Sequence, residues 1–363
     1  MKVRTILFAL AATTFLASCG GSEKKSTVIE KSAVTKITGT VEDTTVTEVR
    51  IRVVEPELDT TITVKDGKFE IKLPKSERSY GMILLMEKNQ GKYGTYFVPD
   101  GSAIAVTQKG DDMTAPSDAD GPQSAYNAYY EKVRKIYESG SEDADAELEK
   151  LWLETVKANP DNGAALLAIA DATYYLSPDK ILEITDGLSD AIKKDELVAS
   201  VIANAEAKMN TNEGKKFTDF TVEHVYGYDE STDPQPLKEE VKFSDYVGKG
   251  TTYVLVDFWS PWCGPCKREI PNIKQVYEQY KDKGLEVLSI AVWEREPQSH
   301  TIETAEKLGM DWHHINNAGS VPTDIYGIDG IPHLMLIGPD GTILKRGFHG
   351  LEGIQAAVAE YIK

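Results

Sequence analysis

The chain has 363 residues, of which 41% are hydrophobic and 27% are charged, and its formal net charge at pH 7 is −18. This length predicts two or three domains, and the composition is that of a globular chain rather than a disordered or fibrous one. The acidic balance argues against nucleic acid as a partner, because phosphate recognition needs clustered Lys and Arg.

The first nineteen residues have the form of an export signal. A short positively charged segment precedes an apolar stretch at 6–16, which is too short to span a bilayer as a stable helix. The stretch ends in Leu-Ala-Ser-Cys at 16–19, which resembles the lipobox of bacterial lipoproteins. The resemblance implies a signal peptide over 1–18 and lipidation of Cys19. The alternative is an ordinary secretory signal in which Cys19 is incidental.

Residues 20–35 are rich in Gly, Ser, Lys and Glu, and we expect them to be a flexible linker. A lipid anchor on Cys19 would hold the folded part at a membrane, facing the periplasm of the cell envelope. The sequence does not decide between the inner and the outer membrane.

Alternating apolar and polar residues predict a small all-β, sandwich-like domain over 36–110. The clearest pair of strands, 61–65 and 68–73, is separated by Asp66-Gly67. Asp-Gly between two alternating runs favours a hairpin with a type I′ turn. Further strands are expected at 37–41, 47–54, 80–86, 94–98 and 103–107.

A helical segment is expected over 120–212, after an acidic linker that contains Pro and Gly. Ser177-Pro178 is typical of a helix start, and a last helix is expected at 195–209. We interpret the tyrosines of this segment as core packing rather than as a ligand platform. The order of a β domain followed by helices resembles the N-terminal half of envelope lipoproteins with TlpA-type C-termini, and it assigns no chemistry to 36–212.

From residue 215 the pattern is that of an α/β domain. A first strand is expected at 217–222 and a polar loop at 229–240. The near-continuous apolar run at 253–259 suits a strand that is buried on both faces of a sheet. Directly after it, residues 260–267 read Ser-Pro-Trp-Cys-Gly-Pro-Cys-Lys, and apolar residues at helical spacing follow.

Cys263 and Cys266 lie three residues apart at the start of this helix. The only other cysteine is Cys19, so the pair is either a reactive couple or part of a metal site, not one bridge of a disulfide scaffold. At the helix N-terminus Cys263 meets unpaired N–H groups and the positive end of the helix dipole, which favour its thiolate. Only a thiolate attacks a disulfide, and Cys266, one turn later, could then resolve the mixed disulfide.

Residues 215–363 closely resemble thioredoxin, especially its TlpA/ResA-type extracytoplasmic relatives. The resemblance lies in Val-Asp-Phe-Trp-x-x-Trp-Cys-Gly-Pro-Cys-Lys, in Pro271, and in Ile331-Pro332 ahead of an apolar run. It implies a thioredoxin fold and a thiol:disulfide oxidoreductase with a redox disulfide between Cys263, which attacks, and Cys266, which resolves. It implies no cofactor and no metal.

The resemblance also implies roles for residues around the pair. Asp257 matches the family's buried acid, whose pKa burial should raise and which could accept the proton of Cys266. The alternative is a structural ion pair, although the strand at 288–292 lacks the usual lysine partner. Pro332 matches the family's cis-proline, and a cis bond there would leave the backbone of Ile331 open to an extended substrate.

Two side chains near the motif are open to interpretation. We interpret Trp262 as a partly exposed lid that contributes to substrate binding and catalysis. His333 replaces the small residue that usually follows the cis-proline, and it either tunes the electrostatics of the cysteine pair or lies on the rim.

Three other readings compete. A zinc site of Cys263, Cys266, His313 and His314 fits poorly, because neighbouring residues on a strand point to opposite faces. A peroxidase would need a Pro-x-x-x-Thr/Ser-x-x-Cys setting, which Pro261-Trp262-Cys263 does not match. A redox-inactive binding protein on this scaffold would have lost a cysteine or the cis-proline. In this sequence neither cysteine is missing, and the proline is present as well.

The dipeptide between the cysteines indicates the direction of electron flow. Gly-Pro is the pair found in thioredoxin, whose potential of about −270 mV is far more reducing than the roughly −120 mV of DsbA. We therefore expect reduction or isomerisation of disulfide-containing envelope proteins, with electrons supplied by a membrane donor.

Overall fold

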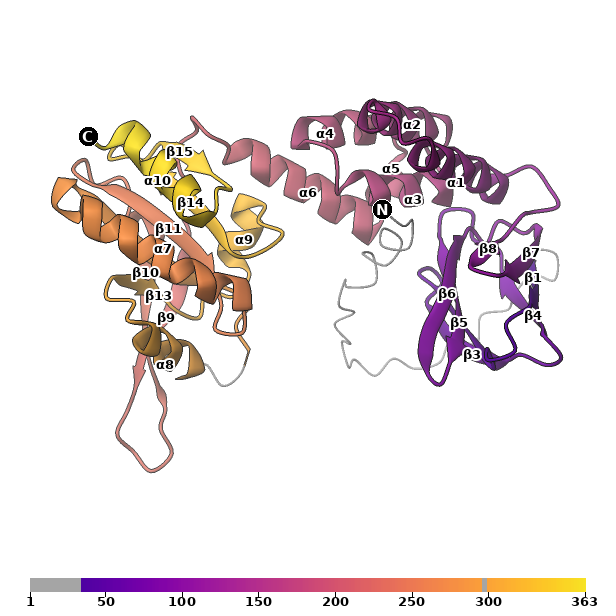
Figure 1. Ribbon diagram of the computed structural model, residues 1–363, viewed down its shortest axis with the longest axis horizontal. Helices are drawn as coiled ribbons and strands as arrows, with labels where there is room; N and C mark the ends of the chain where they lie inside the picture. Colours follow the sequence, from indigo (N-terminus) through magenta and orange to yellow (C-terminus); the bar gives the residue numbers. More distant parts are fainter. Residues whose placement is uncertain (1–33, 296–298) are drawn as a thin grey trace. The chain divides into compact units, whose positions relative to one another are not determined.

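The computed structural model describes residues 34–295 and 299–363. The chain divides into two compact units at the boundary between Ile202 and Ala203, and each unit is described by itself (Figure 1). No helix within the described ranges is long and apolar enough to cross a membrane. The expected signal peptide, the lipidated Cys19 and most of the linker lie outside the described residues and stay predictions.

The described part of the N-terminal unit starts with eight short strands in two four-stranded sheets, ordered β4-β1-β7-β8 and β3-β2-β5-β6. In most strands buried and exposed side chains alternate, so each sheet turns one face inward. The inward residues of both sheets, among them Ile37, Ile51 and Leu85, form one hydrophobic core. The strands are β1 Val34–Val41, β2 Glu48–Val53, β3 Leu58–Thr63, β4 Lys68–Pro74, β5 Gly81–Glu87, β6 Gln90–Phe97, β7 Ala103–Lys109 and β8 Asp112–Thr114.

The turn at Asp66-Gly67 has the expected backbone but does not join paired strands. Both residues have positive φ, 51° and 68°, and Lys65 and Lys68 exchange two backbone hydrogen bonds of 2.9 Å. Beyond this one bridge β3 pairs with β2, while β4 pairs with β1 in the other sheet. The predicted hairpin is therefore wrong, because alternation fixes which face of a strand is buried and not which strand lies beside it.

Helices follow the sheets and complete the N-terminal unit. Trp152 donates a 3.0 Å hydrogen bond to the hydroxyl of Tyr129, which donates one of 2.6 Å to Asp171. Tyr126 and Tyr129 are buried in the interior, in agreement with core packing, whereas Tyr174 and Tyr175 are 59% and 48% exposed and depart from that prediction. Ser177 precedes a helix as expected, but its side chain makes no capping hydrogen bond. The helices are α1 Pro122–Ser139, α2 Ala144–Ala158, α3 Gly163–Ala172, α4 Pro178–Asp186, α5 Asp190–Lys193 and α6 Glu196–Asn210, the last of which crosses the boundary between the units.

The C-terminal unit is built on a five-stranded mixed sheet of order β13-β12-β11-β14-β15. The central strand β11 is parallel to β12 and antiparallel to β14. Val254, Val256 and Phe258 lie in one hydrophobic cluster, whereas Leu255 and Trp259 lie in another. The run at 253–259 is thus buried on both faces, as predicted. The strands are β11 Tyr253–Trp259, β12 Leu285–Ala291, β13 His313–Ile315, β14 His333–Ile337 and β15 Ile343–Arg346.

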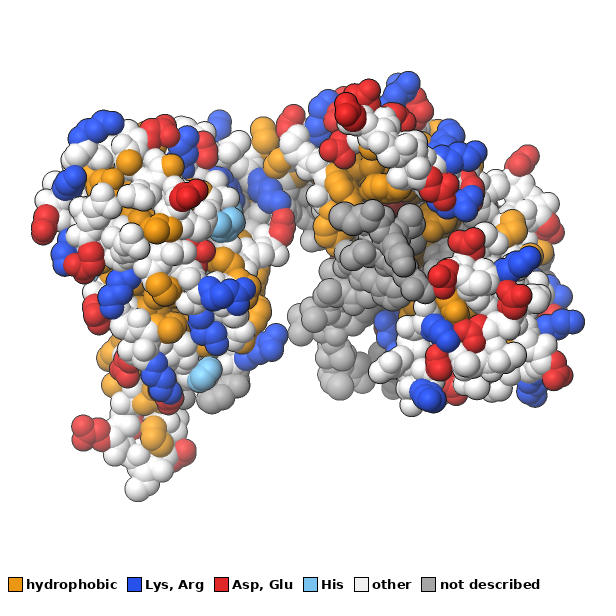
Figure 2. Space-filling view, viewed as in Figure 1, with side chains coloured by type: hydrophobic (Ala, Val, Ile, Leu, Met, Phe, Trp, Pro, Cys, Tyr) orange, Lys and Arg blue, Asp and Glu red, His pale blue; other side chains and the backbone are white. Residues whose placement is uncertain are grey.

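Helices and a hairpin cover the two faces of this sheet. Residues of α7 (Gly264–Tyr280) and α10 (Gly350–Tyr361) pack in one cluster, and residues of α9 (Val321–Tyr326) pack in the other. A further helix, α8 Ser299–Leu308, precedes β13, and the short 3-10 helices η3 (Phe243–Asp245) and η4 (Lys281–Lys283) complete the described elements. On the face shown in Figure 2, Lys and Arg are interspersed with Asp and Glu and do not gather into one basic patch.

The beginning of the C-terminal unit differs from the prediction. An antiparallel hairpin joins β9 (Thr221–Tyr228) to β10 (Pro236–Lys242), where the sequence predicted a strand at 217–222 and a loop at 229–240. The turn is confined to 229–235. Most side chains of β10 are exposed, and several are Lys or Glu. The strand was missed because it lacks the alternation of apolar residues that identifies a half-buried strand.

Gly163 offers a test of packing within the N-terminal unit. A Cβ at this first residue of α3 would lie 2.1 Å from the carbonyl oxygen of Ser79. We expect Gly163→Ala to lower the free energy of unfolding by about 1–3 kcal/mol, because the backbone must shift. Gly187→Ala is the matched control, since a Cβ there meets no atom within 4 Å, and we expect it to be neutral or slightly stabilising. Urea unfolding followed by circular dichroism measures both, and equal transition midpoints would contradict the contact.

Candidate active site

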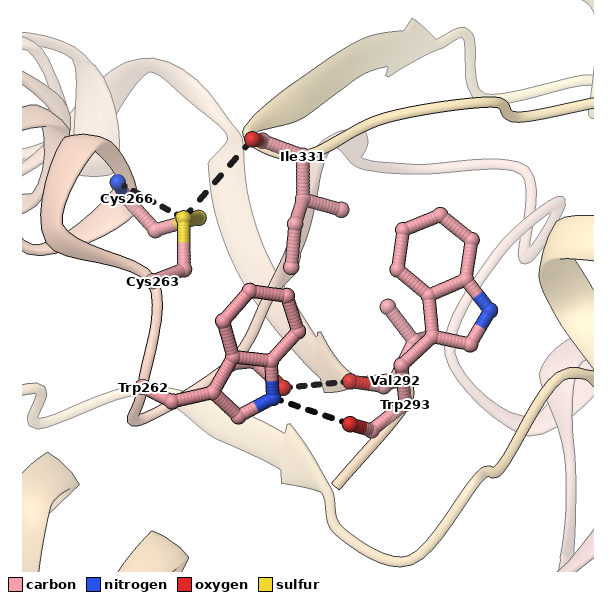
Figure 3. Close-up of a disulfide and its surroundings, with 7 residues drawn as sticks. Trp262, Cys263, Cys266, Val292, Trp293 and Ile331 are labelled. Atoms are coloured by element: carbon pink, nitrogen blue, oxygen red, sulfur yellow. Dashed lines mark hydrogen bonds between the residues drawn. A yellow bond between two sulfur atoms is a disulfide. The ribbon is translucent and has the colours of Figure 1, made fainter. Parts of the chain in front are cut away.

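A disulfide joins Cys263 and Cys266 where β11 ends and α7 begins (Figure 3). Cys263 is the N-cap of α7, and its sulfur accepts a 3.1 Å hydrogen bond from the backbone N–H of Cys266. In the reduced protein the same N–H and the helix dipole would stabilise a thiolate at Cys263. Cys266 is fully buried, whereas Cys263 is 3% exposed. Both sulfurs are therefore buried, and the backbone N–H of the helix start is directed at that of Cys263.

The peptide bond between Ile331 and Pro332 is cis and lies beside the disulfide. The carbonyl oxygen of Ile331 is 3.7 Å from the sulfur of Cys263, and Figure 3 shows it directed toward that sulfur. Pro332 has no N–H, and β14 starts only at the next residue, His333. The structure thus brings the backbone of Ile331 to the sulfur that would bond to a substrate.

Trp262 precedes the disulfide and is 40% exposed. Its ring nitrogen donates a 2.9 Å hydrogen bond to the carbonyl oxygen of Trp293, and the Arg295 guanidinium lies 4.6 Å from the centre of its ring. The Ser260 hydroxyl also donates to the carbonyl of Val292. Two hydrogen bonds therefore join the loop before Cys263 to the end of β12. Trp293 and Arg295 belong to no motif, so sequence reasoning did not single them out.

Asp257 lies on β11 and is 1% exposed. Burial raises its pKa to about 7, partly offset by a 3.1 Å hydrogen bond from the hydroxyl of Ser289, and the charge of Glu269 raises the pKa further. The other carboxyl oxygen has no hydrogen-bond partner within the described part of the chain. A carboxyl with this pKa exchanges its proton near neutral pH, as an acceptor for a buried thiol must.

Ser289 occupies the position on β12 that faces Asp257 in register. Its hydroxyl donates to Asp257 and accepts a 2.9 Å hydrogen bond from the ring nitrogen of Trp312. The strand that lacks the expected lysine thus presents to Asp257 a neutral hydroxyl, that of Ser289, which is hydrogen-bonded to Trp312. Because no cation among the described residues compensates for burial, the pKa of Asp257 stays high.

Glu269 is a second buried carboxyl that sequence reasoning missed. It lies on α7, three residues after Cys266, and is 8% exposed. One of its oxygens accepts a 2.8 Å hydrogen bond from the backbone N–H of Gly350, at the start of α10. The available signal was its spacing, since residues three apart on a helix share a face.

His333 follows the cis-proline and faces Phe258 in register, with 6.2 Å between ring centres. Burial lowers its pKa to about 3, and the charge of Arg346 lowers it further. Its Nε2 is buried and has no hydrogen-bond partner among the residues described. The imidazole is therefore neutral at physiological pH and adds no charge beside the cysteine pair.

The two histidines considered for a zinc site lie on β13. Nε2 of His314 is 2.8 Å from the carbonyl oxygen of Met310, while the two sulfurs are bonded to each other. Within residues 34–295 and 299–363, no three His, Cys, Asp or Glu side chains gather in a way that could hold a metal ion.

Part of the chain is similar to known proteins. Residues 214–346, within the C-terminal unit, match the family model of the AhpC/TSA family, and this unit has a thioredoxin-like fold. Its relatives include proteins named thiol-disulfide oxidoreductase ResA. The one from Geobacillus thermodenitrificans is 32% identical over 106 residues, which are 29% of this chain and 58% of the relative. The one from Bacillus subtilis is 27% identical over 138 residues, 38% of this chain and 68% of the relative.

The match is partial on both sides, since the chain spans about 58% of the length of the first of these relatives. Two solved structures are also similar to part of the chain. The thioredoxin domain of a thiol-disulfide oxidoreductase from Bacteroides vulgatus is 22% identical, with a TM-score of 0.33 over 42% of this chain and 99% of that one. A thioredoxin-like protein from Bacteroides caccae is 17% identical, with a TM-score of 0.42 over 65% and 88%.

The raised pKa of Asp257 predicts a pH dependence of stability. Between pH 4 and 7 the carboxyl is protonated in the folded protein and ionised in the unfolded chain, so raising the pH favours unfolding by up to roughly 1.4 kcal/mol per pH unit. Asp257→Asn removes this dependence and should be increasingly stabilising, relative to wild type, as the pH rises from 4 to 7. Urea unfolding of both oxidised proteins measures the difference, and a constant difference across this range would contradict the prediction.

Proposed function

We propose that the chain is a thiol–disulfide oxidoreductase of the cell envelope that reduces or isomerises protein disulfides through Cys263 and Cys266. The observation that carries the proposal is the position of the Cys263 sulfur. It accepts the N–H of Cys266 at a helix start and lies 3.7 Å from the Ile331 carbonyl next to a cis-proline. These two contacts support a role for Cys263 as the activated sulfur, next to a backbone edge that could receive a substrate.

The first step is attack of the Cys263 thiolate on a substrate disulfide. A mixed disulfide forms, the substrate S–S bond breaks, and one substrate sulfur leaves as a thiolate that takes up a proton from water. The backbone of Ile331 pairs with the extended substrate, and Trp262 covers the site from the other side. The helix start favours the thiolate form of Cys263, so that this sulfur is a good nucleophile here and a good leaving group in the next step.

The second step releases the product and regenerates the disulfide seen in the structure. Asp257 accepts the proton of Cys266, and the resulting thiolate attacks the sulfur of Cys263. The mixed disulfide breaks and the second substrate sulfur leaves as a thiolate. Two electrons pass from the cysteine pair to the substrate. The burial that raises the pKa of Asp257 to about 7 supports this role.

The Gly-Pro dipeptide between the cysteines supports a reducing potential, nearer to about −270 mV than to −120 mV. A reductase outside the cytoplasm needs electrons from a membrane donor. Lipidation of Cys19 would tether the protein, through the linker at 20–35, to the membrane that holds this donor. We further propose that a sandwich-like domain over 36–110 and a helical segment over 120–212 precede the redox domain and carry no redox chemistry.

Two serine variants test the mechanism. We expect Cys263→Ser to abolish reduction of insulin in the presence of dithiothreitol, because no activated sulfur remains to attack. Cys266→Ser should instead accumulate mixed disulfides with substrate, visible by mass spectrometry and released by reductant, because attack proceeds and resolution does not.

Other outcomes would favour the alternative functions. Equal, mild losses from both variants would contradict the assignment, and insulin left unreduced by the wild type would refute reductase activity. Consumption of hydrogen peroxide that depends on Cys263, without insulin reduction, would support a peroxidase. Inactivity toward both substrates would support a redox-inactive binding protein.

A further inference from the structure

The loop that carries the cis-proline is anchored by a helix outside the family match. Helix α9 ends at Tyr326, and Gly327 caps it in the left-handed region, with φ of +60°. Four residues separate Gly327 from Pro332, and Asp329 and Gly330 among them are exposed. What fixes the position of Ile331 must therefore come largely from contacts with neighbouring elements.

The first contact is a close approach of α6 to Gly327. A Cβ at Gly327 would lie 2.7 Å from the backbone oxygen of Asn204 and 3.0 Å from the backbone nitrogen of Lys208. No side chain fits between the loop and the helix at this point. Gly327 thus satisfies two demands, the positive φ of the cap and the approach of the α6 backbone.

The second contact is made by Asp329, two residues before Ile331. One carboxylate oxygen accepts a 2.6 Å hydrogen bond from the side-chain amide of Asn204, and the other bonds to the ammonium group of Lys208. Asn204 and Lys208 are four residues apart on α6 and so lie on one face of the helix. Both carboxylate oxygens are therefore directed toward α6.

The third contact closes the base of the loop. The guanidinium of Arg346 donates a 2.8 Å hydrogen bond to the carbonyl oxygen of Tyr326 and one of 2.9 Å to the carbonyl oxygen of Thr211, directly after α6. Burial lowers the pKa of Arg346, but its guanidinium remains charged at any physiological pH. One side chain of β15 thus binds the end of α6 and the end of α9 together.

We infer that Asn204 and Lys208 of α6, acting through Gly327 and Asp329, are positioning residues that hold the Ile331–Pro332 backbone ready for a polypeptide substrate. The inference rests on the proposed function, because it concerns the edge that would pair with an extended substrate beside Cys263. A loosened edge weakens binding of a protein disulfide. It leaves the reaction of Cys263 with a small disulfide unchanged, since that reaction needs no backbone pairing.

Gly327→Ala tests the close approach. We expect the KM for insulin to rise about tenfold or more with little change in kcat, because small misplacements of a binding edge are costly. The rate of reaction of the reduced protein with dithiobis-nitrobenzoate, a small disulfide, should stay within about twofold of wild type. Gly140→Ala is the matched control: it also replaces a left-handed helix cap, with φ of +61°, but a Cβ there meets nothing within 4 Å.

Asp329→Asn tests the side-chain contact. It also provides a second test of the positioning role if Gly327→Ala does not fold. Because the Lys208–Asp329 pair is partly exposed, we expect only about a two- to fivefold rise in the KM for insulin. Asp329→Glu, which keeps the charge, should recover part of it. Asp340→Asn is the control, since it removes an exposed ion pair with Lys216 elsewhere in the same unit, and we expect no change in KM.

The outcomes separate the two proposals. A wild-type protein that does not reduce insulin refutes the proposed function itself. An active wild type with an unchanged KM in Gly327→Ala, or in Asp329→Asn should the glycine variant not fold, overturns the positioning role. Equal losses toward insulin and the small disulfide would overturn it as well, because they would place the effect on the thiolate rather than on the binding edge.

Discussion

The hydrogen bond from the Cys266 N–H to the Cys263 sulfur is the interaction on which the site depends. It exists because a strand buried on both faces ends and a helix begins within four residues, so that an N–H of the first turn of α7 points at the side chain of Cys263. Proline at the second helical position costs nothing there, since its missing N–H would have been unpaired. The chemistry of the pair thus follows from where two regular elements meet.

The electrostatics of Asp257 follow from the lack of a nearby cation among the described residues. A carboxyl buried in a strand is costly when ionised, and a nearby cation would normally offset that cost. Here β12 offers the hydroxyl of Ser289, oriented by Trp312, in place of a cation. Neutral Asp257 can keep its proton in the oxidised protein and give it up only near neutral pH. A neutral His333 on the neighbouring strand leaves this balance undisturbed.

The parts that sequence could predict are those set by local patterns. The double burial of 253–259, the helix start at Cys263 and the positive φ of Asp66 and Gly67 each follow from a few adjacent residues. Partners distant in sequence could not be read in this way, which is why β3 and β4 were joined in a hairpin although they belong to different sheets. Strand β10 was not predicted, because its exposed, charged side chains do not alternate with apolar ones.

The same limit applies to the site. Cys263, Asp257 and Pro332 lie in motifs that can be recognised from the sequence. Glu269, Trp293 and Arg346 could not be recognised in this way. Their contacts, with Gly350, Trp262 and Tyr326 respectively, form only in the folded chain. A lone charged residue on a helix or strand carries no signal of what it will meet across the fold. These contacts could not be predicted because the partners are far apart in the sequence, and not because the interactions are weak.

Helix α6 runs across the division between the two units, and its last eight residues, 203–210, belong to the redox unit although the family match begins only at residue 214. A fragment trimmed to the match would retain both sulfurs and the whole sheet. Such a fragment would nevertheless lack the end of α6, so that Gly327 would lose its neighbouring helix and the carboxylate of Asp329 would face water. Measurements on such a fragment would report the reactivity of the thiols more faithfully than the binding of a substrate. The natural first residue of an isolated redox unit is Ala203.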